Sequence, residues 1–184
     1  MIVGVSPRTK FVLFALLVLI IAPFVIFLVP LAYFETVYVH VDSWQILIPK
    51  QNFILLGAGF LCLILILLLF AWKRRGVTYG LGAILLAGAV FVFFQSQRSY
   101  IAFQESGVEM LVYGDMQHYY WADMKDITYE AYEPHHDQAS YYIFRMENGE
   151  SFKVTENGQL AEKKGKMLAI IREHDINFIE NYHD

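Results

Sequence analysis

Three long apolar runs occupy the first half of the chain, and short alternating segments occupy the second half. The runs extend over residues 11–33, 53–72 and 77–94, and none of them contains Asp, Glu, Lys, Arg or His. A helix needs about 20 residues to cross the roughly 30 Å hydrocarbon core of a bilayer. The pattern therefore predicts three transmembrane helices, which form a membrane anchor over residues 1–95.

Small residues recur along the third apolar run. Gly76, Gly80, Ala83 and Ala87 follow one another at spacings of four, three and four, so they share one helix face. Small residues let two membrane helices approach closely. Two interpretations follow: this face packs against the Leu-rich second helix, or it joins two copies of the chain in a homo-oligomer. The runs lack ionisable side chains, which disfavours a proton or ion path, because such paths need intramembrane acids or bases.

The polar segment between the first two runs also carries a β pattern. Residues 36–42 are β-branched and aromatic with partial alternation, which predicts a short strand. With three crossings this segment shares a compartment with the C-terminal half, on which it can pack. Trp44 and Pro49 are expected at the membrane interface, where Trp is enriched.

After Arg98 hydrophobic and polar positions alternate, and this period of two predicts β-strands. Asn148-Gly149 is a strong hairpin signal, because these residues tolerate the positive φ of both turn positions. An amphipathic helix is expected from about residue 157 to 173, while residues 176–182 show no clear period. The expected strands cover residues 100–103, 108–113, 118–121, 127–132, 141–146 and 151–154.

Six or more short antiparallel strands followed by one helix predict a small α+β or all-β domain over residues 96–184. Its expected form is a barrel or sandwich capped by the C-terminal helix. Two segments, Phe103–Val108 and Trp121–Ile127 with its Trp-x-Asp-apolar-x-x-Ile pattern, carry a family resemblance. Followed by a hairpin and a final helix, they resemble the bacterial PH-like domains, which are often attached to a few transmembrane helices. The resemblance covers roughly residues 98–174 and implies structural roles for Trp121 and Ile127 and a non-catalytic binding or assembly role for the domain.

Charge separates the two halves. The chain has 14 Lys and Arg and 18 Asp and Glu, for a net charge of −4. Six of the bases but only Glu35 and Asp42 of the acids precede residue 96, so the anchor carries about +4 and the C-terminal domain about −8. Clustered Lys and Arg attract nucleic acids and anionic membrane surfaces, so an acidic domain is a poor candidate to bind either. This excludes nucleic acid as a partner and differs from the basic pocket of lipid-binding PH domains.

The positions of the bases predict an orientation. Arg8 and Lys10 precede the first run, residues 73–75 (Lys-Arg-Arg) connect the second and third, and the loop between the first two runs has Lys50 alone. The positive-inside rule places the N-terminus and the 73–75 turn in the cytoplasm. Three crossings then place the C-terminal domain outside, in a multi-pass protein of the inner or cytoplasmic membrane.

Aromatic side chains supply the candidate binding surface. Tyr119, Tyr120, Tyr132 and Tyr142 lie in predicted strands, where alternate side chains point into the core and out to solvent. Tyr suits half-wet interfaces and is enriched where proteins bind one another. These four residues are the candidate partner surface.

Metal binding and catalysis are disfavoured. His135, His136 and Asp137, with Glu133 and with His118, His174 or His183 as further ligands, are the only arrangement that hints at a metal. Adjacent histidines on a loop rarely reach one ion together, so a solvated loop is favoured. The single cysteine, Cys62, lies inside an apolar run. No Gly-x-Ser-x-Gly, phosphate-binding Gly-Lys or His-Glu-x-x-His motif is present, so we expect neither a cofactor nor an enzyme.

The sequence favours a non-catalytic integral membrane protein whose PH-like domain binds a protein partner. It would act as an accessory or regulatory subunit of a cell-envelope complex. The alternative is a module that binds lipid or a small ligand at the membrane surface. A metal-dependent enzyme or hydrolase around His135 and His136 is a third and weaker hypothesis.

Overall fold

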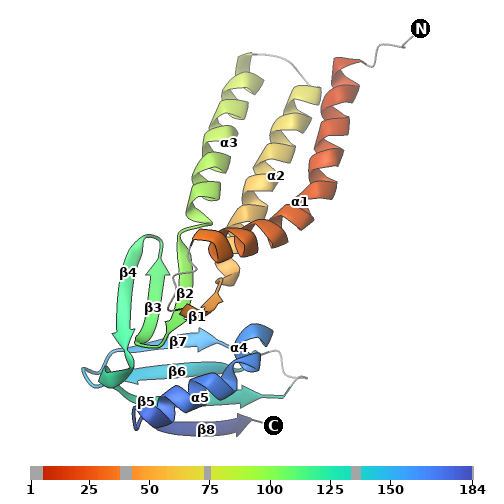
Figure 1. Ribbon diagram of the computed structural model, residues 1–184. Helices are drawn as coiled ribbons and strands as arrows, with labels where there is room; N and C mark the ends of the chain where they lie inside the picture. The colour runs from red at the N-terminus through yellow and green to blue at the C-terminus, as the bar shows by residue number, and fades with distance from the viewer. Residues whose placement is uncertain (1–5, 38–42, 73–75, 134–137, 184) are drawn as a thin grey trace. The chain divides into compact units, whose positions relative to one another are not determined.

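The computed structural model describes residues 6–37, 43–72, 76–133 and 138–183, and the chain divides into two compact units (Figure 1). The first unit consists mainly of three long helices, α1 (Pro7–Val37), α2 (Lys50–Trp72) and α3 (Gly76–Gln95). All three are long and apolar enough to cross a membrane, which confirms the three predicted spans. The chain therefore has the composition of a multi-pass membrane protein.

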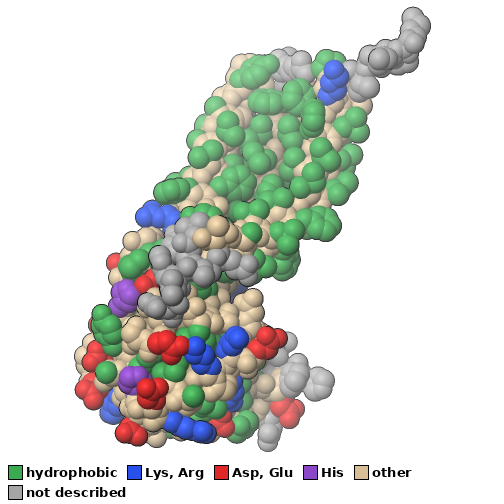
Figure 2. All heavy atoms as spheres, in the orientation of Figure 1, with side chains coloured by type: hydrophobic (Ala, Val, Ile, Leu, Met, Phe, Trp, Pro, Cys, Tyr) green, Lys and Arg blue, Asp and Glu red, His purple; other side chains and the backbone are tan. Residues whose placement is uncertain are grey.

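The three helices pack side by side, with α2 in contact with both α1 and α3. Most of their large apolar side chains remain exposed, as the hydrophobic surface of this unit in Figure 2 shows. Lipid is the solvent that suits such a surface. α1 contains Pro23 and Pro30, and Figure 1 shows this helix changing direction in its second half. Proline removes a backbone donor and crowds the preceding turn, which accounts for the bend.

The small residues that pack α3 against α2 are not the predicted ones. Gly82 and Ala89 are buried, and a side chain at Gly82 would approach the Phe70 ring within 2.8 Å. At 100° per residue this face lies about 140° around the helix from the predicted one. The predicted residues are all exposed: Gly76, Gly80, Ala83 and Ala87. The interpretation that they pack on α2 is therefore wrong, while homo-oligomerisation through them stays a prediction.

The second unit contains two four-stranded sheets. In the first the strand order is β1-β2-β3-β4, and in the second it is β7-β6-β5-β8. β8 pairs with β5 in parallel, whereas the β1–β2, β5–β6 and β6–β7 pairs are antiparallel. The first sheet comprises β1 (Ser43–Leu47), β2 (Ser99–Gln104), β3 (Gly107–Val112) and β4 (Asp115–Tyr120). The 3-10 turn η1 (Trp121–Asp123) leads to the second, made of β5 (Met124–Tyr132), β6 (Tyr141–Met146), β7 (Ser151–Thr155) and β8 (Asn177–His183), with α4 (Gly158–Glu162) and α5 (Lys164–Glu173) between β7 and β8.

A helical anchor joined to a β domain is thus confirmed, but the described strands form two separate sheets rather than one closed barrel. Two elements differ from expectation at the ends of the domain. The strand expected at 36–42 is found at Ser43–Leu47, since α1 continues to Val37 and residues 38–42 lie outside the described ones. β8 was not expected, and it adds an edge strand to the second sheet.

Three local details also differ from the sequence reading. Trp44, expected at the membrane interface, packs on Phe103, with ring centroids 5.3 Å apart, and its interfacial position stays a prediction. The expected helix over 157–173 breaks into α4 and α5. Of the Asn148-Gly149 pair only Gly149 has positive φ, at 88°, so the turn is a type I turn followed by a glycine rather than the mirror-image turn.

One hydrophobic core fills the second unit, and Trp121 lies at its centre. The indole is fully buried and lies near Phe103 and Phe144, with centroid distances of 6.5 and 6.4 Å. Its Nε1–H donates to the Gln104 carbonyl at 3.0 Å. At Gly107 any Cβ would collide with the Tyr119 carbonyl oxygen, so the strands approach there more closely than a side chain permits. Gln104 and Gly107 lie in the first segment of the family resemblance and Trp121 begins the second, so these contacts give structural roles to residues of both segments.

Candidate functional site

The four tyrosines of the predicted partner surface do not form one surface. Tyr142 is fully buried, so its assignment to a surface is wrong. Tyr119 points toward the core and stacks on Phe152, with ring centroids 4.4 Å apart, while Tyr120, the next residue, is 53% exposed. Tyr132 lies half-buried at the end of β5. Adjacent strand residues point to opposite faces, which explains why these neighbours separate.

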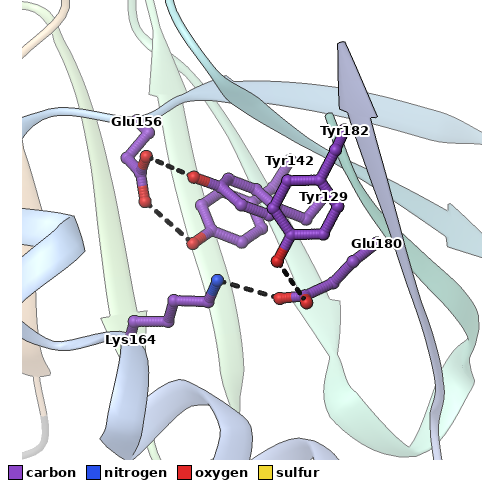
Figure 3. A network of polar contacts seen from close by, with 6 residues as sticks. All are labelled: Tyr129, Tyr142, Glu156, Lys164, Glu180 and Tyr182. Atoms are coloured by element: carbon purple, nitrogen blue, oxygen red, sulfur yellow. Dashed lines mark hydrogen bonds and ion pairs between the residues drawn. The ribbon is translucent and has the colours of Figure 1, made fainter. Parts of the chain in front are cut away.

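Tyr142 belongs instead to a polar network on the inner face of the second sheet (Figure 3). The Tyr129 and Tyr142 rings stack with centroids 4.6 Å apart, and both hydroxyls donate to the Glu156 carboxylate, at 2.7 and 3.0 Å. Lys164 lies 4.2 Å above the Tyr129 ring and forms a 2.9 Å ion pair with Glu180. The network therefore ties the chain after β7 and the start of α5 to strands β5, β6 and β8.

The electrostatics of this network favour a structural role. Burial and the hydrogen bond to Glu156 raise the pKa of Tyr129 to about 12. Burial, followed by the charge of Glu156, also raises the pKa of Tyr142. The Lys164 ion pair and the hydrogen bond donated by Tyr182 lower the pKa of Glu180. A phenol with a raised pKa is a poor proton donor near neutral pH. Because the residues of this network pair with one another, we interpret it as a structural network that stabilises the fold.

The outer face of the same sheet carries a row of side chains across all four strands. Tyr132 on β5 stacks on Tyr141 of β6, with centroids 6.0 Å apart, and on His183 of β8, at 4.7 Å. At the β7 end of the row, Lys153 Nζ lies 3.1 Å from the centre of the Tyr141 ring. Glu130 accepts hydrogen bonds from His183 at 2.5 Å and from Asn181 at 2.8 Å. These two bonds lower the pKa of Glu130.

The rest of this outer face mixes charge with aliphatic surface. Arg145 Nη1 lies 2.7 Å from Asp126 Oδ1 and 3.3 Å from the Thr128 hydroxyl. Ile179 is 38% exposed on β8, and Ile143 is half-buried on β6. Tyr and Arg, which this face carries, are enriched at protein–protein interfaces. We call this face, with Lys153, Tyr141, Tyr132 and His183 toward one end of it, the tyrosine row.

Sequence reasoning found only Tyr132 of the tyrosine row. The predicted partner surface did not include Tyr141, Lys153 or His183, although the alternation of β6 contained a signal. Tyr141, Ile143 and Arg145 share one parity, whereas Tyr142, Phe144 and Met146 share the other. A charged residue on one parity marks the outer face. His183 lies on β8, so no local pattern of the sequence reveals its neighbours.

The histidine candidates do not come together as a metal site in the part of the chain that the structure describes. Residues 134–137, which include His135, His136 and Asp137, lie outside it. Among the described residues no group of three or more His, Cys, Asp or Glu side chains is arranged to hold an ion. His118 is engaged with the buried Glu109, at 3.0 Å, and that carboxylate also accepts a hydrogen bond from Tyr100.

No protein-family model matches this chain, and no curated protein matches it either.

Proposed function

We propose that this protein is a non-catalytic membrane-anchored binding protein whose C-terminal domain docks a protein partner on the tyrosine row. In this role it is an accessory or regulatory subunit of a cell-envelope membrane complex. The observation that carries the proposal is the row itself, in which one solvent-facing sheet surface presents two tyrosines, an imidazole and a lysine across four strands. Tyrosine offers large contact area at a low cost in side-chain entropy, so it is favoured at binding surfaces.

A PH-like ancestry for the domain is part of this proposal. Support comes from the order of strands followed by a helix, and from Trp121 and Ile127, which are both fully buried in the core. Strands β1 and β8 lie outside the span of the resemblance. PH-like domains bind partners without chemistry of their own, which fits a row of side chains that contains no nucleophile activated by a base.

Site-specific photocrosslinking in native membranes tests the partner proposal. A photoreactive p-benzoylphenylalanine replaces Ile179 on the outer face, and a matched control replaces Ala169, which is exposed on α5. We expect one discrete crosslinked species from position 179 and none from position 169. Adding Tyr141→Ser should remove that species, because it deletes the ring that contacts both Tyr132 and Lys153. Crosslinks of equal yield at both positions, or ones that ignore Tyr141→Ser, would refute docking on this face.

The cell compartment of the domain is a separate proposal, based on the positive-inside rule. We propose that the N-terminus is cytoplasmic and the C-terminal domain extracytoplasmic, in the inner membrane. With Cys62→Ala as background, Ser140→Cys is treated with a membrane-impermeant thiol reagent on intact cells or spheroplasts. Labelling before lysis is expected. Labelling only after lysis would place the domain in the cytoplasm and move the partner search there.

A further inference from the structure

A second surface lies in the membrane unit, where the third helix ends. α3 ends at Gln95, and the Arg98 N–H donates to the Gln95 carbonyl at 3.2 Å, so Arg98 stays within one turn of the helix end. α3 is a 20-residue membrane-spanning candidate. A helix of this length just covers the hydrocarbon core, which places Arg98 at the level of the headgroups. Arginine at this depth extends its charged end toward the polar region.

The Arg98 guanidinium is held in place without being neutralised. It lies 5.1 Å from the centre of the Phe94 ring. On another side it lies against the Gly114 backbone so closely that a Cβ on Gly114 would collide with Nη2. Among the residues that the structure describes, Arg98 makes no ion pair within 4.0 Å, and the side chain is partly exposed. Its charge is therefore available to an anion.

The turn at residues 112–114 provides an apolar border beside this charge. The Tyr113 N–H donates to the Ser99 hydroxyl at 3.2 Å, which fixes the turn next to Arg98. Tyr113 and Val112 are 51% and 44% exposed. Tyr113 and Gly114 both have positive φ, at 50° and 96°, as a tight two-residue turn requires. Tyrosine is enriched at the membrane–water interface, where its ring is apolar and its hydroxyl is wet.

We propose that Arg98, bordered by Val112 and Tyr113, binds the phosphate of a membrane phospholipid. A guanidinium matches a phosphate with two parallel hydrogen bonds, and the exposed Val112 and Tyr113 side chains suit the glycerol and upper acyl region. A membrane phospholipid is the expected ligand, because the site begins within one turn of the end of the membrane-spanning helix. The acid nearest along the chain to the 112–114 turn is Asp115, and its Oδ2 accepts a hydrogen bond from Gln117 at 3.4 Å. This site is independent of the tyrosine row.

Native mass spectrometry of the full-length, delipidated protein in detergent micelles tests the proposal. Phosphatidylglycerol is titrated, and the population of the singly lipid-bound protein is measured. We expect Arg98→Gln to weaken the first binding event about tenfold, since it removes the charge-assisted hydrogen bonds to the phosphate. Arg98→Lys should retain part of the affinity, because it keeps the charge but loses the planar fork.

Lys50 provides the matched control. It begins α2 and is exposed, and the Asn52 side chain two residues later donates to the Ser99 carbonyl at 2.6 Å, so both cations lie at the same end of the helices. Lys50→Gln should bind phosphatidylglycerol like the unchanged protein. Equal losses in Lys50→Gln and Arg98→Gln, or no loss in Arg98→Gln, would overturn the site.

Two further measurements use the unchanged protein, so their outcome does not depend on whether a variant folds. Diacylglycerol with the same acyl chains lacks the phosphate and should bind more weakly than phosphatidylglycerol. If it binds equally, the phosphate is not recognised and the proposal fails. Inorganic phosphate at the concentration of the lipid should not compete, because it lacks the acyl chains. Full competition by it would assign the site to free phosphate rather than to a lipid.

Discussion

The two faces of the second sheet use the same residue type for different purposes. On the inner face Tyr129 and Tyr142 stack at 4.6 Å and are 8% and 0% exposed. On the outer face Tyr132 and Tyr141 lie 6.0 Å apart and are both half-buried. Tyr141 and Tyr142 are neighbours in the chain, yet one faces solvent and the other lies in the core. A shift of one residue along a strand thus decides whether a tyrosine stabilises the fold or forms a surface.

The carboxylates on the two faces show the same contrast. Glu156 accepts hydrogen bonds from the two inner phenols, whereas Glu130 accepts from the exposed His183 and Asn181. Buried hydrogen bonds are costly to break, because the partner left behind has no water to replace them. Exposed ones are easily replaced by water. The inner network should therefore control stability, and the outer row should be open to a partner at little cost.

Removing one tyrosine from each face gives the largest predicted difference. Tyr142→Ala should cost about 3–5 kcal/mol of unfolding free energy, as for other large aromatic side chains deleted from a core. Tyr141→Ala should cost less than about 1 kcal/mol, the usual range for surface changes. Urea unfolding of the full chain in micelles, followed by tryptophan fluorescence, measures both. Similar losses for the two variants would mean that the outer tyrosine is also part of the core.

Alkaline pH should break the inner network next. The pKa of Tyr129 is raised to about 12, above its usual value near 10, because burial and Glu156 favour the neutral phenol. A raised folded-state pKa gives stability that is complete below pH 10 and is lost as pH rises from about 10 to 12, since only the unfolded chain releases the proton there. Unfolding measured at stepped pH values, with tyrosinate absorbance, should show this loss, and Tyr129→Phe should reduce it. If all tyrosines titrated near pH 10 without unfolding, the inner network would not have the stabilising role proposed for it.

The membrane half and the middle strands were predictable because each has a strong local pattern. Twenty apolar residues without a charge have few alternatives to a spanning helix, so α2 and α3 match their predicted spans closely. Period-two alternation likewise located β2 to β7 to within a few residues. The Gly149 hairpin was also located, although its turn type was not, because both turn types place Gly at this position.

Features that depend on distant pairing were not predictable. Hydrophobic and polar residues alternate only weakly along β8. Its inner side carries the polar residues Glu180 and Tyr182, and the Glu180 carboxylate pairs with Lys164 and Tyr182. β8 pairs in parallel with β5 over seven residues, and no local pattern in the sequence reveals this long-range pairing. For the same reason His183 was not placed beside Tyr132. The exposed small residues of α3 illustrate a related limit, since spacing identifies a helix face but not its neighbour.

The smallest predicted effect tests the outer face at acid pH. The pKa of Glu130 is lowered because His183 and Asn181 hydrogen-bond to its carboxylate. A lowered folded-state pKa gives stability that is present above the usual value near 4.5 and is lost as pH falls through the lowered value. Since the site is exposed, the loss should be confined to β8, where the protection of the Asn177–His183 amides against hydrogen exchange should fall as pH drops below 4.5. Glu130→Gln should make this exchange fast at neutral pH and remove the acid dependence, while the exchange of β6 stays slow. Accelerated exchange in β6 as well would show that the outer row, like the inner network, is part of the structural core.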